Sequence, residues 1–218
     1  MSKLGRVRPI QKAKRILRRE VAFLLSVLSK DDKRNQETSI YNKIFALPQF
    51  KNATRIATYI STELEVDTEP IISYALENNK LCFVPRYKFR KKQMDMVQLD
   101  CLKDLEIIKS RKCNNVHNVR HSDVRIDALD SGGLDLIIVS GLAYTKHGKR
   151  LGHGGGYFDT YLKRINTQFN IHPTSMALAF REQLFPYLPT HLHDVNIDIV
   201  ITPDSIYENK NVNKLNLN

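Results

Sequence analysis

The chain has 218 residues, of which 42% are hydrophobic and 26% charged, and its formal net charge at pH 7 is +11. This balance predicts one soluble domain with a sizeable core and excludes an intrinsically disordered chain. No run of about 18 apolar residues occurs, so we expect neither a transmembrane helix nor a membrane partner. Cys82, Cys101 and Cys113 lack CxxC spacing, which excludes a disulfide framework and a zinc ribbon and predicts reduced cytosolic thiols.

The positive charge is concentrated in two segments. Residues 1–20 carry eight basic residues against one acid, Glu20, and a second basic run extends from Lys80 to Lys92. Such a balance fits a nucleic-acid partner or a small polyanionic ligand. We expect a cytoplasmic protein whose residues 1–10 form a basic extension. A mitochondrial transit peptide is the alternative, and it weakens if Lys14 and Arg18 belong to a site.

The amino-terminal third is predicted to be helical. Apolar residues recur every three or four positions from Ile10 to Leu28, which predicts an amphipathic helix ending near Ser29. Lys14 and Arg18 share one face of this helix, and most such pairs form a solvated basic face. A second helix is predicted at 35–47, ended by Pro48.

Short β-rich stretches then alternate with helical ones. Strands are predicted at 55–61, 81–85, 134–140, 175–180 and 197–202, with a weaker candidate around Met94, Met96 and Val97, and helices at 69–79 and 157–165. This alternation predicts an α/β fold with a mostly parallel central sheet flanked by helices in three layers, α/β/α. One domain should span 11–205, and the Asn-rich tail 206–218 should fray.

The segment HGKRLGHGGGYFD (147–159) contains five of the chain's nine glycines. It lies between the predicted strand 134–140 and a helix starting near Tyr157, where α/β sheets bind ligands and a helix amino terminus attracts anions. Glycine lets backbone amides approach a ligand, and Lys149, Arg150 and His153 add basic groups. The loop therefore predicts a phosphate site, although it is neither a Walker A loop nor a complete Rossmann fingerprint.

Several polar residues have two interpretations. Asp159 could reach phosphates through Mg²⁺ or merely interact with the helix dipole. His191, His193 and Asp194 could bind a transition metal, but nearby prolines favour a solvated loop, with Asp194 assisting Mg²⁺ as an intermediate option. Glu65 could pair with two adjacent N–H donors of a heterocycle. From the residues alone, a surface glutamate is the favoured interpretation.

Taken in order, these motifs resemble the 5-formyltetrahydrofolate cyclo-ligase family, also called 5,10-methenyltetrahydrofolate synthetases. The matching segments are KRILR (14–18), YISTELEVDT (59–68), VPRY (84–87), GGLDLIIVSGLAY (132–144), the glycine loop and a following ALAF…Q…LP…HD pattern. The resemblance covers the chain from about Lys14 to Ile201.

The resemblance implies a set of site residues. It assigns ATP to Lys14, Arg18, Arg150, Leu151, Gly152, His153, Gly154, Gly155, Gly156, Tyr157 and Phe158. It assigns Mg²⁺ to Asp159 and Asp194, and the folate substrate to Ile60, Glu65 and Tyr157. Arg150 and Tyr157 are the implied catalytic residues. The chain departs from the usual family pattern at Gly155, Phe158 and Thr145, where a basic residue, Tyr and Asp are common.

The implied reaction converts 5-formyltetrahydrofolate or its polyglutamates to 5,10-methenyltetrahydrofolate, with ATP as co-substrate, Mg²⁺ as cofactor, and ADP and phosphate released. Phosphorylation of the formyl oxygen would let N10 attack the formyl carbon and expel phosphate. Such phosphoryl transfer needs alignment and charge neutralisation more than a dedicated acid or base. We expect a monomer. We also expect no nucleic-acid partner, because aromatic residues are not interleaved with the basic residues as single-strand binding requires. The alternatives are a nucleic-acid-binding protein and a degenerate family member that binds without turnover.

Overall fold

Five short strands pair in parallel at the centre of the molecule, and an antiparallel strand lies at each edge. The computed structural model describes residues 9–109, 112–113, 116–117, 119, 124–191 and 194–209. The parallel strands are β1 (Arg55–Ala57), β2 (Leu81–Lys88), β6 (Leu136–Ile138), β9 (Thr174–Leu178) and β10 (Ile199–Ile201). With the edge strands β3 (Gln93–Leu99) and β11 (Ile206–Glu208), the order of the seven-stranded sheet is β11-β10-β9-β6-β1-β2-β3.

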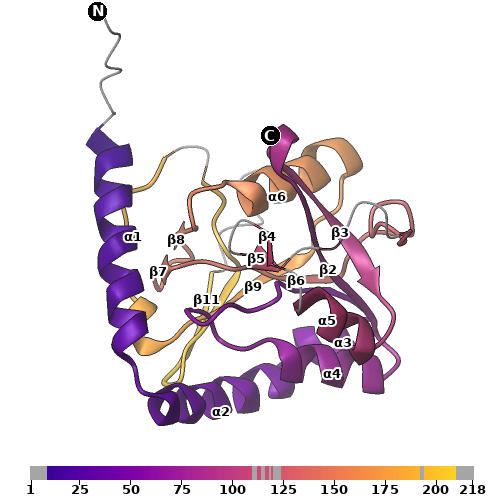
Figure 1. Cartoon of the computed structure of the whole chain (residues 1–218), viewed down its shortest axis with the longest axis horizontal. Helices are drawn as coiled ribbons and strands as arrows, with labels where there is room; N and C mark the ends of the chain where they lie inside the picture. Colours follow the sequence, from indigo (N-terminus) through magenta and orange to yellow (C-terminus); the bar gives the residue numbers. More distant parts are fainter. Residues whose placement is uncertain are drawn as a thin grey trace, which may run out of the picture.

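Helices cover both faces of this sheet. They are α1 (Pro9–Val27), α2 (Lys30–Ala46), α3 (Pro48–Asn52), α4 (Glu69–Glu77), α5 (Leu102–Lys109) and α6 (Tyr157–Phe169). Figure 1 shows α6 on one side of the strands, α2 and α4 on the other, and α1 along one flank. The predicted α/β architecture with a mostly parallel, helix-flanked sheet is confirmed. No helix in the described part of the chain has the length and apolar character to cross a bilayer.

Local signals explain where the second helix begins. Ser29 caps α2, its side chain accepting a hydrogen bond of 3.1 Å from the amide of Asp32. Asp31 and Asp32 then place negative charge in the first turn, which the helix dipole favours. The helix therefore starts five residues earlier than the predicted Asn35, because these capping residues extend it beyond its apolar stripe.

Four of the five predicted strands are shorter than expected because their apolar ends leave the sheet, whereas β2 runs to Lys88, three residues beyond its predicted end. β1 ends at Ala57, yet Tyr59 and Ile60 stay buried beyond it. All three residues of β6 and of β10 are buried. Burial on both faces of the sheet explains the unbroken apolar runs. Each fully buried Ile or Leu side chain contributes about 1.5–3 kcal/mol to the free energy of unfolding.

Two further differences concern the connections. The tail predicted to fray begins instead with β11, in which Ile206 and Glu208 pair with β10. A small hairpin of β7 (Ala143–Tyr144) and β8 (Arg150–Leu151) interrupts the predicted strand-to-helix loop. Its turn requires glycine, since Gly148 has φ +74° and an added Cβ would lie 2.1 Å from the Ile197 carbonyl oxygen. A second small sheet pairs β4 (Lys112–Cys113) with β5 (Val116–His117).

The topology creates one divergence point. From β1 the chain passes to β2 on one side, and the later strands β6, β9 and β10 lie on the other. Connections therefore diverge beyond the carboxyl ends of β1 and β6, where open α/β sheets form a ligand crevice. The loop after β1 carries Glu65, and the segment after β6 leads through Ser140 to the glycine loop.

Candidate active site

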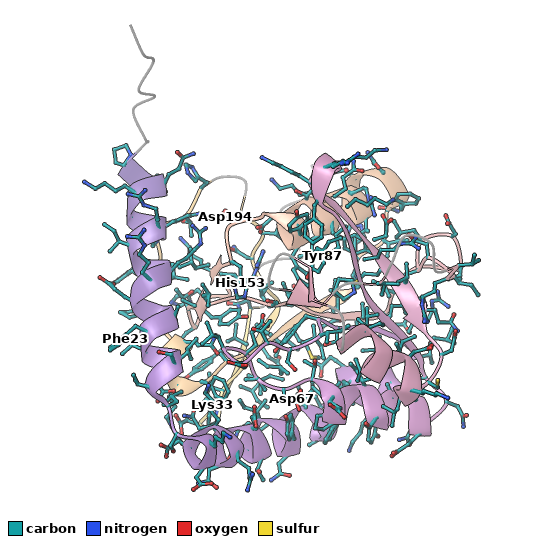
Figure 2. All side chains as sticks on the ribbon, in the orientation of Figure 1. Phe23, Lys33, Asp67, Tyr87, His153 and Asp194 are labelled. Atoms are coloured by element: carbon teal, nitrogen blue, oxygen red, sulfur yellow. The ribbon has the colours of Figure 1, made fainter. Side chains whose placement is uncertain are left out.

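A cleft of about 1410 Å³ opens beside the loops that follow β1 and β6. It is lined by parts of α1 and α2, residues 59–65 after β1, the rings of Tyr87 and Phe89, the glycine loop and Asp194. All residues that the sequence assigned to the site line it except Leu151, which is buried in β8. Figure 2 shows His153, Asp194 and Tyr87 above α2 in this region.

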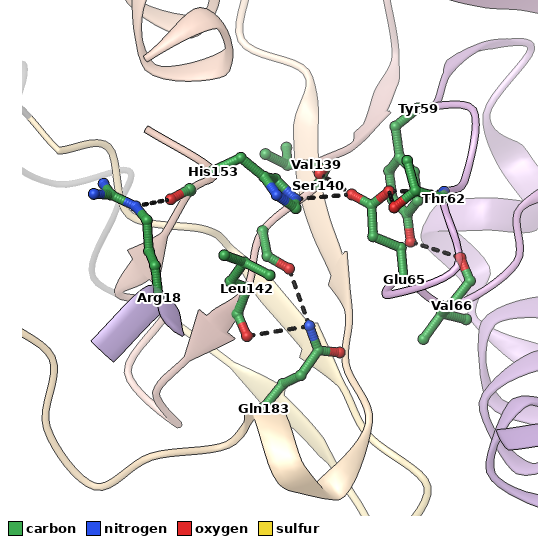
Figure 3. A network of polar contacts seen from close by, with 12 residues as sticks. Arg18, Tyr59, Thr62, Glu65, Val66, Val139, Ser140, Leu142, His153 and Gln183 are labelled. Atoms are coloured by element: carbon green, nitrogen blue, oxygen red, sulfur yellow. Dashed lines mark hydrogen bonds and ion pairs between the residues drawn. The ribbon is translucent and has the colours of Figure 1, made fainter. Parts of the chain in front are cut away.

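Glu65 is the most enclosed acid of the cleft. The residue is only 8% exposed, so the interpretation as a surface glutamate is wrong. Its Oε2 accepts hydrogen bonds from the amide of Thr62 at 2.9 Å and the hydroxyl of Thr62 at 2.8 Å. Its Oε1 accepts one from Ser140 and lies 3.0 Å from His153 Nε2 (Figure 3). This network joins the loop after β1 to the segment after β6.

The same contacts keep Glu65 ionised. Burial on its own raises the pKa of the carboxyl, but hydrogen bonds from His153, Ser140 and Thr62 outweigh burial and lower the pKa below its usual value. Nearby, burial and the Glu65 charge raise the pKa of Tyr87, so its hydroxyl stays protonated. The cleft therefore presents a fixed negative charge beside neutral aromatic groups.

Two basic residues of α1 line the cleft on the side of the glycine loop and Asp194. Lys14 Nζ lies 2.5 Å from Asp194 Oδ2, and Arg18 Nε donates to the Gly152 carbonyl at 2.8 Å. Lys14 is 9% exposed, so the solvated-face interpretation is wrong for this residue. Burial raises the pKa of Asp194, but the Lys14 hydrogen bond and the His191 amide outweigh burial and lower it. Asp194 is thus ionised at neutral pH.

Arg150 lies beneath the glycine loop and is largely withdrawn from solvent. Its side chain is 3% exposed, pairs with Asp159 Oδ1 at 2.8 Å and donates to the Ser140 carbonyl at 2.9 Å. Its guanidinium carbon lies 5.9 Å from the centre of the Phe158 ring. The buried Nε of Arg150 has no hydrogen-bond partner among the described residues. Arg150 therefore orders the base of the loop and retains one unsatisfied donor.

The two acids assigned to Mg²⁺ converge. The amide of Val195, next to Asp194, donates to Asp159 Oδ1 at 3.2 Å, which brings both acids to one end of the cleft. Within the described ranges, no group of three or more His, Cys, Asp or Glu is arranged so that it could hold a metal ion. A pair of carboxylates without further protein ligands fits Mg²⁺, which usually takes one or two carboxylates and completes its shell with water and phosphate. His193 lies outside the described residues.

The end of the glycine loop leaves a helix amino terminus open. Gly156 caps α6 with φ +70° and offers no side-chain hydrogen bond, so the first N–H groups of α6 have no side-chain cap. An added Cβ at Gly155 would lie 2.5 Å from the Tyr157 ring. That ring packs edge-on against Tyr87, with centroids 5.0 Å apart, and against Phe89 at 6.2 Å. Gly155 thus lets an aromatic wall form next to the anion-attracting helix end.

Comparison with known proteins decides the family. The model of the 5-formyltetrahydrofolate cyclo-ligase family matches residues 10–203. The chain belongs to the 5-formyltetrahydrofolate cyclo-ligase family. As a member of this family it is an enzyme of the ligase class, which confirms the resemblance drawn from the motifs.

Relatives of the cyclo-ligase family align over most of their length. The chain is 41% identical to a mouse 5-formyltetrahydrofolate cyclo-ligase over 196 residues, covering 90% of this chain and 96% of the mouse protein. A probable 5-formyltetrahydrofolate cyclo-ligase of Caenorhabditis elegans is 31% identical, with 88% and 93% covered. The fold is similar to that of a 5,10-methenyltetrahydrofolate synthetase of Aquifex aeolicus, with a TM-score of 0.71, 23% identity, and 90% and 93% covered.

Some cleft residues of this cyclo-ligase family member escaped the sequence analysis. Thr62 and Glu65 stand in a T-x-x-E spacing, in which a Glu side chain can accept from the Thr amide, as it does here, so this spacing could have predicted that Thr62 contacts Glu65. Tyr87 is the last residue of the VPRY motif and Phe89 directly follows β2, and neither ring carried a separate signal as part of the cleft. Lys30 and Arg34 line the cleft from α2 because the helix packs beneath it, which spacing alone does not reveal.

Proposed function

We propose that this cleft converts 5-formyltetrahydrofolate to 5,10-methenyltetrahydrofolate in a reaction that consumes ATP, requires Mg²⁺ and releases ADP and phosphate. The observation that carries the proposal is the network centred on Glu65, in which an ionised carboxylate beside an aromatic wall is tied to a glycine-rich helix amino terminus. The half of the cleft beside Glu65 suits a pterin, and the half beside the glycine loop suits a polyphosphate. The names of the relatives, 5-formyltetrahydrofolate cyclo-ligase and 5,10-methenyltetrahydrofolate synthetase, contain the proposed substrate and product.

The nucleotide is proposed to lie along α1 and the glycine loop. Lys14 and Arg18 supply positive charge, and the uncapped N–H groups of α6 supply donors for phosphate oxygens. Arg150 Nε adds a buried donor that lacks a partner in the described part of the chain. Leu151 and Phe158 are proposed to support the loop through packing, since both are buried.

The folate is proposed to lie between Glu65 and the aromatic wall. The carboxylate would accept the pterin's amino and ring N–H groups, and Ile60 would pack against the ring. Tyr157 stands at the junction of the folate and nucleotide halves, which suits a residue that aligns the formyl group with the phosphate. The polyglutamate tail is proposed to follow Lys30 and Arg34 on α2, because Arg90 and Lys91 line a separate hollow.

The chemistry requires alignment. Transfer of the terminal phosphoryl group to the formyl oxygen releases ADP and converts that oxygen into a leaving group. N10 then bonds to the formyl carbon, the C–O bond breaks with loss of phosphate, and N10 gives up its proton. Mg²⁺, held by Asp159 and Asp194, would supply charge that neutralises the phosphate oxygens. The residues of the cleft hold both partners in line and exclude water.

The test is a direct assay with the full chain. The absorbance of 5,10-methenyltetrahydrofolate should rise when protein, 5-formyltetrahydrofolate, ATP and Mg²⁺ are mixed, and ADP should form in equal amount. Omission of ATP, or chelation of Mg²⁺, should abolish the signal. Binding of both ligands without product would instead identify a degenerate family member. Salt-sensitive binding of random oligonucleotides, with no ATP binding, would favour the nucleic-acid alternative.

A further inference from the structure

The Glu65 carboxylate is already saturated with hydrogen bonds. An ionised carboxylate offers about four acceptor positions, two on each oxygen. Thr62 fills both positions on Oε2 through its amide and hydroxyl. Ser140 and His153 fill both on Oε1. A heterocycle that presents two N–H donors to Glu65 must therefore displace a donor that is already there.

His153 is the donor that can leave most easily. Two of the other bonds come from Thr62, whose amide is part of the turn that holds Glu65, and Ser140 is buried. The His153 side chain is 45% exposed, so water can replace its contact with the acid. The next residue, Gly154, has φ +109°, a conformation that glycine adopts without strain and that allows the loop backbone to turn at this point.

His153 also stands where a phosphate would attract it. The carbonyl of the preceding Gly152 accepts a hydrogen bond from Arg18. An added Cβ at Gly154 would lie 3.6 Å from Arg18 Cζ, so the guanidinium packs directly against the loop. The helix amino terminus at Gly156 follows three residues after His153. A polyphosphate drawn to Arg18 and α6 thus passes within reach of the imidazole.

We propose that His153 is a positioning residue that couples the two substrates: it occupies Glu65 in the free protein and moves to the nucleotide phosphates when ATP binds. The inference rests on the proposed function of the cleft. It follows that ATP vacates the pterin-binding carboxylate, and that folate releases the imidazole for the phosphates. Each ligand should then tighten the binding of the other by the same factor, because coupling free energies are reciprocal.

The experiment measures binding of 5-formyltetrahydrofolate to the full chain by calorimetry, with and without Mg²⁺ and a non-hydrolysable ATP analogue. In the wild-type protein the analogue should tighten folate binding by about tenfold, the effect of one charge-assisted hydrogen bond. His153→Ala should bind folate without the analogue as tightly as the wild type binds it with the analogue. The analogue should then have no further effect.

Two variants complete the design. His153→Gln can still donate to Glu65 but lacks the imidazole, so it should restore the weak nucleotide-free binding without restoring the response to the analogue. His172→Ala changes an exposed histidine bonded to Asn170 beyond the cleft and should behave as wild type. Weaker folate binding in His153→Ala, or an unchanged response to the analogue, would overturn the coupling role. Failure of the wild-type protein to bind folate would overturn the proposed function as well.

Discussion

Lys14 Nζ on α1 lies 2.5 Å from Asp194 Oδ2, although 180 positions separate the two residues in the chain. A cation assigned to the nucleotide thus neutralises an acid assigned to Mg²⁺. Arg150 and Asp159 repeat the arrangement at 2.8 Å. The free cleft holds these four charges in internal pairs, and the proposed binding of Mg·ATP would exchange the pairs for contacts to metal and phosphate.

Replacing Lys14 with alanine should weaken nucleotide binding. The loss of one charge-assisted contact costs about 1.5–3 kcal/mol, so the apparent KM for ATP should rise at least tenfold. Lys12→Ala removes an exposed lysine of the same helix and serves as the matched control. Steady-state kinetics at saturating folate measure the effect. Equal KM values for the two variants would remove Lys14 from the nucleotide site.

Arg150→Ala should affect both stability and ATP use. The substitution leaves Asp159 and the Ser140 carbonyl without their partner, at a cost of about 1–3 kcal/mol in the free energy of unfolding. In a chain of this size, Tm falls by about 2–4 °C for each kcal/mol lost from the free energy of unfolding. Thermal melting and ATP kinetics should therefore change together, with kcat/KM for ATP reduced at least tenfold. A stable variant with wild-type kinetics would show that Arg150 has neither role.

Asp159→Asn should raise the Mg²⁺ concentration needed for half-maximal activity. Asparagine keeps the shape and one oxygen but loses the charge that a hard cation prefers. Binding of 5-formyltetrahydrofolate should stay within about twofold of wild type, since Asp159 contacts Arg150 and the Val195 amide rather than the Glu65 network. The control is Asp130→Asn, at an exposed position. An unaltered Mg²⁺ titration would leave Asp159 as a partner of Arg150 alone.

Glu65→Gln should weaken folate binding selectively. The amide cannot accept all the hydrogen bonds that the carboxylate takes, and unmet buried donors cost about 1–3 kcal/mol each, or roughly a five- to hundredfold loss of affinity. ATP binding, measured by calorimetry with the analogue, should not weaken, because the Glu65 contact that holds His153 away from the phosphates is itself weakened. Glu77→Gln, exposed on α4, controls for a general effect of losing a charge. Parallel losses for folate and ATP would indicate a folding defect instead.

Asp95 on β3 should govern stability in acid. Burial raises its pKa, but hydrogen bonds from Lys88 and Arg164 outweigh burial and lower the pKa below its usual value. A carboxyl with a lowered pKa contributes stability above its unfolded-state pKa, and this stability is lost as the pH falls through its folded-state pKa. The free energy of unfolding in urea should thus decrease below about pH 4. Asp95→Asn should be less stable than the wild type at pH 7, and its free energy of unfolding should fall less on acidification than that of the wild type. A parallel loss in both proteins would exclude Asp95 as the cause.

The sequence predicted the order of elements well because local signals determine it. Apolar runs fixed the five parallel strands, and the glycine cluster placed the start of α6 at Tyr157. Burial of individual charged side chains was harder to predict. Lys14 and Glu65 looked solvent-exposed because their burial depends on Asp194 and Ser140, which lie far away in the chain. Long-range pairing of this kind leaves no periodic trace in the sequence.

The turn of the β7–β8 hairpin is held by residues that flank the last two described strands. The Ile197 amide donates to the Gly148 carbonyl at 2.8 Å, and the Ile197 carbonyl accepts a hydrogen bond from the Asn209 side chain at 3.0 Å. Asn209 directly follows β11, so the turn at Gly148 takes its position from the edge of the sheet. A slip of β11 along β10 would break the Asn209 contact and loosen the support of this turn, so the register of an edge strand would influence the nucleotide affinity proposed for the glycine loop.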